Sequence, residues 1–458
     1  MAAPLATAES SDNPWLLRLG IALVLGIAFA VIAHKWAASY YAFLAESGSF
    51  AHRENRFAVQ QSSTTGSSAL GFLLIGGLGA ALAITAPPQR LRWSHPLLLL
   101  FALYAGWCFA SYTWTEFHFL TIRKLAILTL LILGAIGIAV RCSLTDMLWI
   151  IILLVAGELT IGFAAEIANG MFRPWRSDYR YAGTLDPNGI GLEAAVMTLA
   201  AWLVPFERRN RPYVRAALIA LGLGVVVMTK SRTTLAALVA AGMVAFLLRA
   251  RGQQRWWIAT ATITLACLGG LAVNFVSVAA IQESADVASM GRNENVSTLT
   301  GRLPLWQALT KEAERTPWFG HGYGSFWTPT HIYRYSDEFM WHIPHAHNTY
   351  LDHVLAIGLV GLALYLLWML GLAVAGWVRY DRAGHPADLF AACFVTLCLV
   401  HGLAESKIPG SGPPTLLLFT CVAALALNPA VAPASTTAAE PAAPREPLVW
   451  RPARRFGV

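Results

Sequence analysis

The sequence has little charge and few cysteines. Only 13% of its 458 residues are Asp, Glu, Lys or Arg, whereas 56% are hydrophobic and the mean hydropathy is +0.54. Soluble globular domains carry about 25% charged residues, so an ordinary soluble domain is excluded. The six cysteines lie in or beside apolar segments, which indicates small buried side chains and neither a disulfide framework nor a zinc site. They are Cys108, Cys142, Cys267, Cys393, Cys398 and Cys421.

A basic stretch of the kind that opens a signal peptide is also lacking at the N-terminus, so we expect the first apolar segment to be retained. Apolar segments of about 17 to 25 residues, enough to cross about 30 Å of hydrocarbon, recur along the chain, and we count about twelve. They are Trp15–His34, Ala69–Ala86, Pro96–Trp114, Ile122–Val140, Thr145–Ala165, Ile190–Phe206, Tyr213–Thr229, Thr233–Leu248, Trp256–Ala280, Tyr350–Val378, Ala387–Ala404 and Pro414–Leu427.

These segments predict an all-α polytopic membrane protein. Transmembrane helices 1–9 are expected in residues 1–280, one long external loop with short amphipathic helices in 281–348, and helices 10–12 in 349–428. The polar, Ser/Thr-rich segment Ala37–Ser68 is interpreted as an external loop, and the Pro/Ala/Thr-rich residues 429–458 as a disordered cytoplasmic tail.

The arginines orient the predicted helices, because cytoplasmic loops are enriched in Lys and Arg. Alternate short loops are basic and, with the C-terminal tail, place both termini in the cytoplasm of a bacterial inner membrane. The residues are Arg90, Arg92, Arg141, Arg208, Arg209, Arg211, Arg249, Arg251, Arg255, Arg379, Arg382, Arg451, Arg454 and Arg455. The remaining loops are then periplasmic.

Three periplasmic loops nevertheless carry cations, against this bias. These are Arg173, Arg176 and Arg180 in the first loop, Lys230 and Arg232 in a tight hairpin, and Arg302 in the long loop. A planar, permanently charged guanidinium suits phosphate recognition. Two simpler interpretations remain open: Arg232 as an interfacial residue whose charge reaches water, and Arg302 as a solvated loop charge.

The long loop has internal structure. After Arg302, the residues Leu305, Leu309 and Ala313 recur at helical spacing, which predicts a short amphipathic helix that ends before Pro317. The following "GHGYG" predicts a glycine-rich turn.

The sequence "HIPHAHNTYLD" opens the tenth predicted span with several polar side chains. His347 is the best candidate for a general base, with His345, Asn348 and Asp352 as substrate-binding neighbours. A helix cap explains such residues equally well. A metal site at His342, His345 and His347 is less favoured, since the spacing fits no familiar zinc pattern, and we expect no metal or other cofactor.

The order of these motifs resembles the O-antigen ligase and polymerase superfamily. The resemblance covers roughly residues 182–367 and consists of "KSR" at a periplasmic hairpin, "TGR" followed by "PWFGHGYGSF" in one long loop, then "HAHNTYLD" and "GLVGL" in a helix. Within it, the chain is most similar to the O-antigen ligases.

This resemblance implies a GT-C-like, metal-independent, inverting glycosyltransferase. The activity implied is transfer of O-antigen from undecaprenyl diphosphate to lipid A–core oligosaccharide at the periplasmic face. By the same resemblance, Arg232 and Arg302 match the diphosphate-binding arginines, and His347 matches the essential histidine. The expected partners are both lipid-linked substrates and the bilayer, and no nucleic acid.

Three other functions remain open. A polymerase of the same superfamily uses the same donor, and a protein O-oligosaccharyltransferase brings additional periplasmic sequence that this chain lacks. A secondary transporter is a non-enzymatic alternative, for which broken helices and polar groups near the bilayer midplane are expected. The ionisable residues here gather instead towards one face, and the sequence has no evident internal repeat.

Overall fold

The computed structural model describes residues 14–47, 67–86, 95–176, 179–206, 211–250, 253, 302–407 and 409–427. Within them, all regular secondary structure is helical, as predicted. The helices are α1 (Pro14–Ser47), α3 (Ser67–Ile84), α4 (Pro96–Ala110), η1 (Ser111–Thr113), α5 (His118–Arg141), α6 (Leu144–Ala168), α7 (Pro187–Leu203), α8 (Arg211–Met228), α9 (Arg232–Arg249), α12 (Arg302–Ala313), α13 (Pro329–Phe339), α14 (Thr349–Ala383), α15 (Pro386–His401) and α16 (Pro413–Leu427).

Six of these helices are long and apolar enough to cross a membrane: α1, α4, α5, α6, α9 and α14. Helices α3, α8, α15 and α16 are apolar but shorter. The predicted span at 256–280 and the predicted tail at 429–458 lie outside the described residues, so the count of twelve stays a prediction. The expected loop at Ala37–Ser68 is wrong in its first part, because α1 continues through Ser47.

The outer faces of the helices are apolar. Large side chains such as Leu23, Phe119 and Leu370 are more than half exposed. Burying apolar surface is worth about 25 cal/mol per Å², so faces of this kind are unfavourable in water and favourable against lipid tails. The chain is therefore a multi-pass membrane protein.

Side-chain interactions connect the helices at one end of the bundle. There, Arg18 of α1 pairs with Asp146 in the first turn of α6, and Arg141 at the end of α5 donates to Thr85 after α3. Arg379 near the end of α14 pairs with Asp388 at the start of α15. This basic end contains described members of the arginine set used above to predict the cytoplasmic side.

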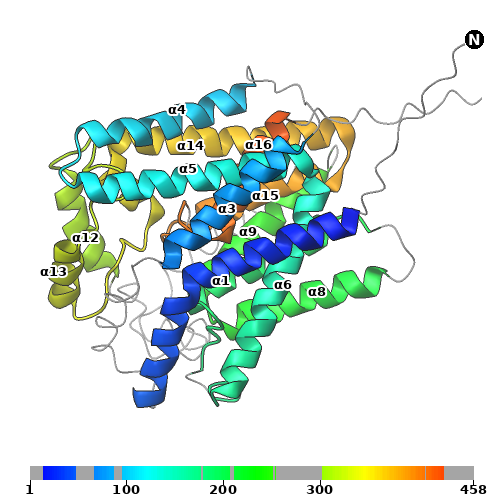
Figure 1. Cartoon of the computed structure of the whole chain (residues 1–458), viewed down its shortest axis with the longest axis horizontal. Helices are drawn as coiled ribbons and strands as arrows, with labels where there is room; N and C mark the ends of the chain where they lie inside the picture. The colour runs from blue at the N-terminus through cyan, green and yellow to red at the C-terminus, as the bar shows by residue number, and fades with distance from the viewer. Residues whose placement is uncertain are drawn as a thin grey trace, which may run out of the picture.

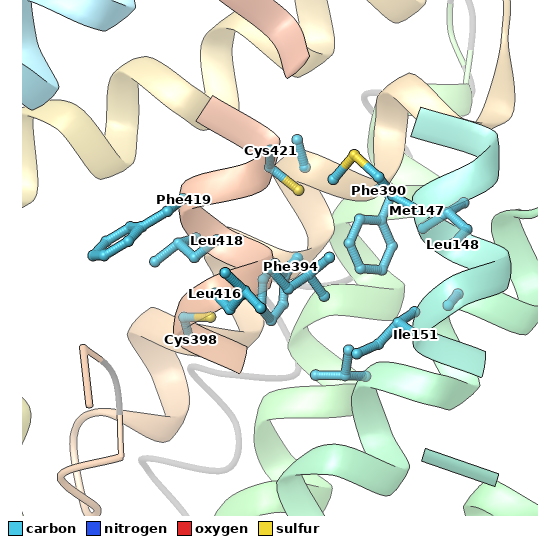
Figure 2. Close-up of a cluster of buried hydrophobic side chains, with 14 of the residues drawn as sticks. Met147, Leu148, Ile151, Phe390, Phe394, Cys398, Leu416, Leu418, Phe419 and Cys421 are labelled. Atoms are coloured by element: carbon cyan, nitrogen blue, oxygen red, sulfur yellow. The ribbon is translucent and has the colours of Figure 1, made fainter. Parts of the chain in front are cut away.

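Buried apolar side chains of α15 and α16 lie near α6 in the interior of the bundle. Figure 2 shows Phe390 and Phe394 of α15 near Met147 of α6, with Leu416 of α16 beside them. All four side chains are almost completely buried. The cysteines of α15 and α16, which are Cys393, Cys398 and Cys421, are free and buried. Cys108 and Cys142 are also free and buried, so the predicted burial is confirmed for the five described cysteines.

Helix α14 is broken at Gly358, whereas the sequence predicted one continuous span. Gly358 has φ 71° and ψ −177°, a conformation essentially restricted to glycine. The carbonyls of Leu355 and Ala356 accept hydrogen bonds from the backbone of His321 and Gly322, at 2.9 and 2.8 Å. The break therefore docks the glycine-rich turn against α14, because the freed backbone groups are bonded to that turn.

Candidate functional site

The described part of the long loop forms a small cap on the bundle. Helix α12 buries Leu305, Leu309 and Ala313, which confirms the predicted amphipathic helix and its face. Together with Tyr335 of α13 and Leu355 of α14 they form a second hydrophobic cluster. Figure 1 shows α12 and α13 at the end of the bundle where α4 ends and α5 begins, away from the basic end.

The segment before α14 holds His347 in a fixed position. Asn348 caps the helix, because its side chain accepts from the backbone of Tyr350 and Leu351, both at 3.0 Å. His347 itself has φ 51°, which is uncommon for a residue with a side chain. Its backbone N–H donates to Nδ1 of His345 at 3.2 Å. His345 and Asn348 thus shape the turn that presents His347.

A buried carboxylate, Glu405, is the centre of the site. It follows α15 and its side chain is 1% exposed. Oε1 accepts from Arg302 Nη2 at 2.5 Å and from Asn188 Nδ2 at 2.6 Å, while Oε2 lies 3.3 Å from Nδ1 of His347. One carboxylate therefore connects α7, α12 and the residues before α14.

Electrostatics keep this carboxylate ionised. Burial alone raises the pKa of Glu405, but the hydrogen bond from His347 and the positive charges of Arg302 and Lys407 outweigh burial. The pKa consequently lies well below its usual range. An ionised carboxylate only accepts hydrogen bonds, so Nδ1 of His347 carries the proton in this contact.

The other ring nitrogen of His347 is available for chemistry. Nε2 is buried and has no hydrogen-bond partner in the described part of the chain. The ring lies between Trp341, at a centroid distance of 5.1 Å, and His345, at 4.1 Å. Burial and the neighbouring His347 lower the pKa of His345 well below its usual value, so His345 is neutral.

Arg302 is the cation nearest to this base in the hydrogen-bond network. Besides Glu405 it donates through Nη1 to the carbonyl of Ala404, at 2.5 Å. Its side chain is 17% exposed. A guanidinium has five N–H groups, so Arg302 keeps donors for an additional anion.

Arg180 connects the site to the hairpin that carries Lys230 and Arg232. Its guanidinium donates to the side chain of Asn188 at 3.0 Å and to the backbone carbonyl of Thr229 at 2.9 Å. Lys230 has φ 51° in the turn, and Arg232 begins α9. The hairpin is thereby attached through Asn188 to Glu405. Arg180 is built into this network and is part-buried.

The other predicted cations of that loop lie on the surface. Arg173 and Arg176 are exposed, on either side of Trp175, which is 77% exposed. The Nε atom of Arg173 donates to the carbonyl of Gly170 at 2.9 Å. Both guanidiniums thus belong to the exposed surface of the loop before α7.

Asp352 has a positioning role. Its carboxylate accepts from Nε1 of Trp327 at 2.7 Å and from the backbone N–H of Ala346 at 3.1 and 3.2 Å. It therefore holds the "HAH" turn against the cap. In the described residues, no group of three or more His, Cys, Asp or Glu side chains is arranged to hold a metal ion.

An ion pair beside the site was not anticipated from the sequence. Nζ of Lys407 lies 2.6 Å from Asp186, which also caps α7 through the backbone of Asn188 and Gly189. Burial alone would lower the pKa of Lys407, but Asp186 and Glu405 outweigh burial and raise it. Burial alone would raise the pKa of Asp186, but the positive charge of Lys407 outweighs burial and lowers that pKa.

Sequence reasoning also missed Glu405 and Asn188. The available signal was "AESK", a carboxylate and a lysine in a short loop of the same predicted face, between the last two spans. The counter-charge of Arg302 thus comes from a distant part of the chain.

Comparison with known proteins finds a similarity over part of the chain. Residues 217–366 match the family model described as O-antigen ligase. This part of the chain, about a third of its length, is therefore similar to the O-antigen ligase family. The match covers most of α8, all of α9, α12 and α13, and the first part of α14. It therefore includes the hairpin, Arg302 and His347, but it ends before Glu405. No curated protein matches the chain.

This similarity supports a general enzymatic function. The family comprises glycosyltransferase-like ligases and polymerases, which use lipid-linked glycans in a membrane. The chain thus combines a membrane-spanning bundle with a polar site at one end.

Proposed function

We propose that this protein is an O-antigen ligase. It transfers a glycan from undecaprenyl diphosphate to a sugar hydroxyl of lipid A–core oligosaccharide at the periplasmic face of the bacterial inner membrane. The observation that supports it best is the single carboxylate, Glu405, which holds a cation, Arg302, on one oxygen and a histidine with a vacant nitrogen, His347, on the other.

His347 acts as the general base in this proposal. Its Nε2 takes the proton from the acceptor hydroxyl as the hydroxyl oxygen attacks the anomeric carbon. The bond from that carbon to the diphosphate oxygen breaks, and attack from the opposite face inverts the configuration. A positioned base of this kind contributes about 10²- to 10⁴-fold to a rate.

Arg302 and Arg232 stabilise the leaving diphosphate. Negative charge grows on the diphosphate as the glycosidic bond breaks, and fixed guanidiniums in a water-poor site are effective in stabilising such charge. The first turn of α14 adds the positive end of a helix dipole next to His347. These charges supply the role that a divalent cation has in other glycosyltransferases, so no metal is needed.

Arg173 and Arg176 steer a phosphorylated substrate to the site. They are exposed, positively charged and on a loop that Arg180 ties to the same network. Long-range attraction of this kind raises encounter rates and decreases with salt. Lys230, Asn348, His345 and Asp352 complete the substrate-binding surface or hold it in shape.

A reconstituted transfer reaction tests the proposal. Purified protein in liposomes is given undecaprenyl-diphosphate-linked glycan and lipid A–core, with and without EDTA. Wild type should produce a slower-migrating lipid A–core in both conditions, and His347→Ala should reduce the rate by about 10²-fold or more. His385→Ala, the same substitution before α15 at the basic end, serves as control.

Two results would contradict the proposal. If the lipid-linked glycan grows longer while lipid A–core stays unmodified, the protein is a polymerase of the same family. If His347→Ala transfers glycan at the wild-type rate, the base is elsewhere.

A further inference from the structure

Glu405 contacts both halves of the proposed machinery, and its two oxygens are not equivalent. Oε1 receives two donors, Arg302 at 2.5 Å and Asn188 at 2.6 Å, whereas Oε2 faces the Nδ1 atom of His347 at 3.3 Å. The side chain is buried, so no bulk water competes for either oxygen. Each oxygen of Glu405 therefore has different partners: Oε1 accepts from Arg302 and Asn188, and Oε2 accepts from His347.

We propose that Glu405 is the positioning residue for His347 and the internal stand-in for the donor's diphosphate on Arg302. The proposal rests on the ligase function above. Glu405 fixes the histidine tautomer with the proton on Nδ1 and the lone pair on Nε2. It also occupies Arg302 until a lipid diphosphate competes for the same guanidinium.

The tautomer argument follows from hydrogen-bond chemistry. A neutral imidazole carries its proton on one nitrogen only, and the partner of the other nitrogen decides which. Because the Glu405 carboxylate accepts and cannot donate, Nδ1 keeps the proton and Nε2 remains able to take one. When Nε2 accepts the proton of the acceptor hydroxyl, the resulting imidazolium lies 3.3 Å from a carboxylate that stabilises its charge.

The stand-in argument follows from charge. In the absence of substrate, Arg302 would be a partly buried cation without a counter-charge, which is costly. Glu405 neutralises it in the same bonding geometry that a phosphate oxygen offers. Diphosphate and Glu405 then compete for Arg302, while the bond from His347 to Oε2 is unaffected by that exchange.

Glu405→Gln separates these two effects. Arg302 and Asn188 both donate, so they hold the oxygen of the introduced amide on their side, and the NH₂ group of that amide must face Nδ1 of His347. A donor at that position forces the proton onto Nε2, the wrong tautomer for a base. At the same time, the loss of a negative charge beside the diphosphate site strengthens donor binding.

Opposite changes in turnover and binding are therefore expected. In liposomes, kcat for glycan transfer should fall by about 10²- to 10⁴-fold, the contribution of a general base, while the Kd for undecaprenyl-diphosphate-linked glycan decreases. His347→Ala with Glu405→Gln should be no slower than His347→Ala alone, because Glu405 acts through His347. Glu312→Gln is the matched control, because Glu312 of α12 pairs with the exposed Arg315 just after that helix, and it should change neither value.

Solid-state NMR of [¹⁵N]histidine protein tests the tautomer without any turnover. The His347 signals are assigned by their loss in His347→Gln. Wild type should show an unprotonated Nε2, and Glu405→Gln an unprotonated Nδ1. This readout separates the two proposals: if no glycan is transferred by wild type but the tautomer switches, the ligase function fails and the positioning role stands.

Three results would overturn the inference. An unprotonated Nε2 in Glu405→Gln refutes the positioning role, and weaker donor binding in that variant refutes the stand-in role. A double variant much slower than His347→Ala alone would show that Glu405 acts on the structure and not through the histidine.

Discussion

Gly358 in the break of α14 provides a sharp test of how the cap is attached to the bundle. A Cβ atom at this position would lie 2.0 Å from the carbonyl oxygen of Trp318 and 2.4 Å from the backbone nitrogen of Phe319. Both are backbone atoms that no rotamer change can move away. With φ at 71°, an L-residue is strained here whatever the space.

The cost of Gly358→Ala can be estimated from two contributions. The backbone conformation costs about 1–3 kcal/mol for a non-glycine residue. Displacing residues 317–322 from α14 breaks up to three backbone bonds, whose acceptors are the carbonyls of Pro317, Leu355 and Ala356. At about 0.5–1.5 kcal/mol each, they bring the expected loss of stability to about 3–7 kcal/mol, a large part of the margin of most proteins.

Thermal unfolding in detergent, followed with a thiol-reactive dye on the buried cysteines, measures this loss. Gly358→Ala should unfold at a much lower temperature than wild type. Gly242→Ala in α9 is the control, because a Cβ there meets nothing within 4 Å and alanine favours a helix by about 1 kcal/mol. If Gly358→Ala is as stable as Gly242→Ala, the docking of the turn onto the broken helix does not support the cap.

Two further predictions concern charges around the site. The double variant Arg173→Ala, Arg176→Ala should raise the KM for lipid A–core and reduce the salt dependence of that KM, with kcat nearly unchanged. Arg180→Ala should instead lower kcat, because it detaches the hairpin. Equal effects of the two variants on kcat would refute this division. Lys407→Met should lower the melting temperature at pH 7, and the difference from wild type should shrink as the pH falls through the depressed pKa of Asp186, because a protonated Asp186 no longer attracts Lys407. A difference that grows on acidification would contradict the ion pair.

Much of the fold follows from the sequence, because a membrane span has to satisfy its own backbone hydrogen bonds. Eleven of the expected apolar segments coincide with described helices, and the face of α12 was predicted from its three apolar residues. The break at Gly358 was not predicted, since a single glycine in an apolar stretch is compatible with an intact helix. Only the approach of Trp318 and Phe319 from the long loop makes the glycine necessary.

The sequence pointed to the cations of the candidate site, but it did not point to its anion, Glu405. Arg232 and Arg302 stood out because basic residues on translocated loops oppose the topological bias, whereas Glu405 follows no bias and carries no local pattern. Its importance comes from contacts with residues 58, 103 and 217 positions away in the sequence, which are His347, Arg302 and Asn188. Long-range contacts of this kind depend on helix packing, for which the sequence alone gives no register.

The arrangement explains why a cationic site can persist in a membrane protein before its substrate arrives. A partly buried Arg302 without a counter-charge would destabilise the folded chain, so the fold itself has to supply an anion. If that anion were bonded only to Arg302, its displacement by a diphosphate would leave a second uncompensated charge in the site. Because Glu405 also accepts from Asn188 and His347, it keeps partners after the exchange, and its released charge lies beside the histidine that becomes positive in the proposed reaction. On this reasoning, donor binding favours proton transfer to His347 through the carboxylate they share.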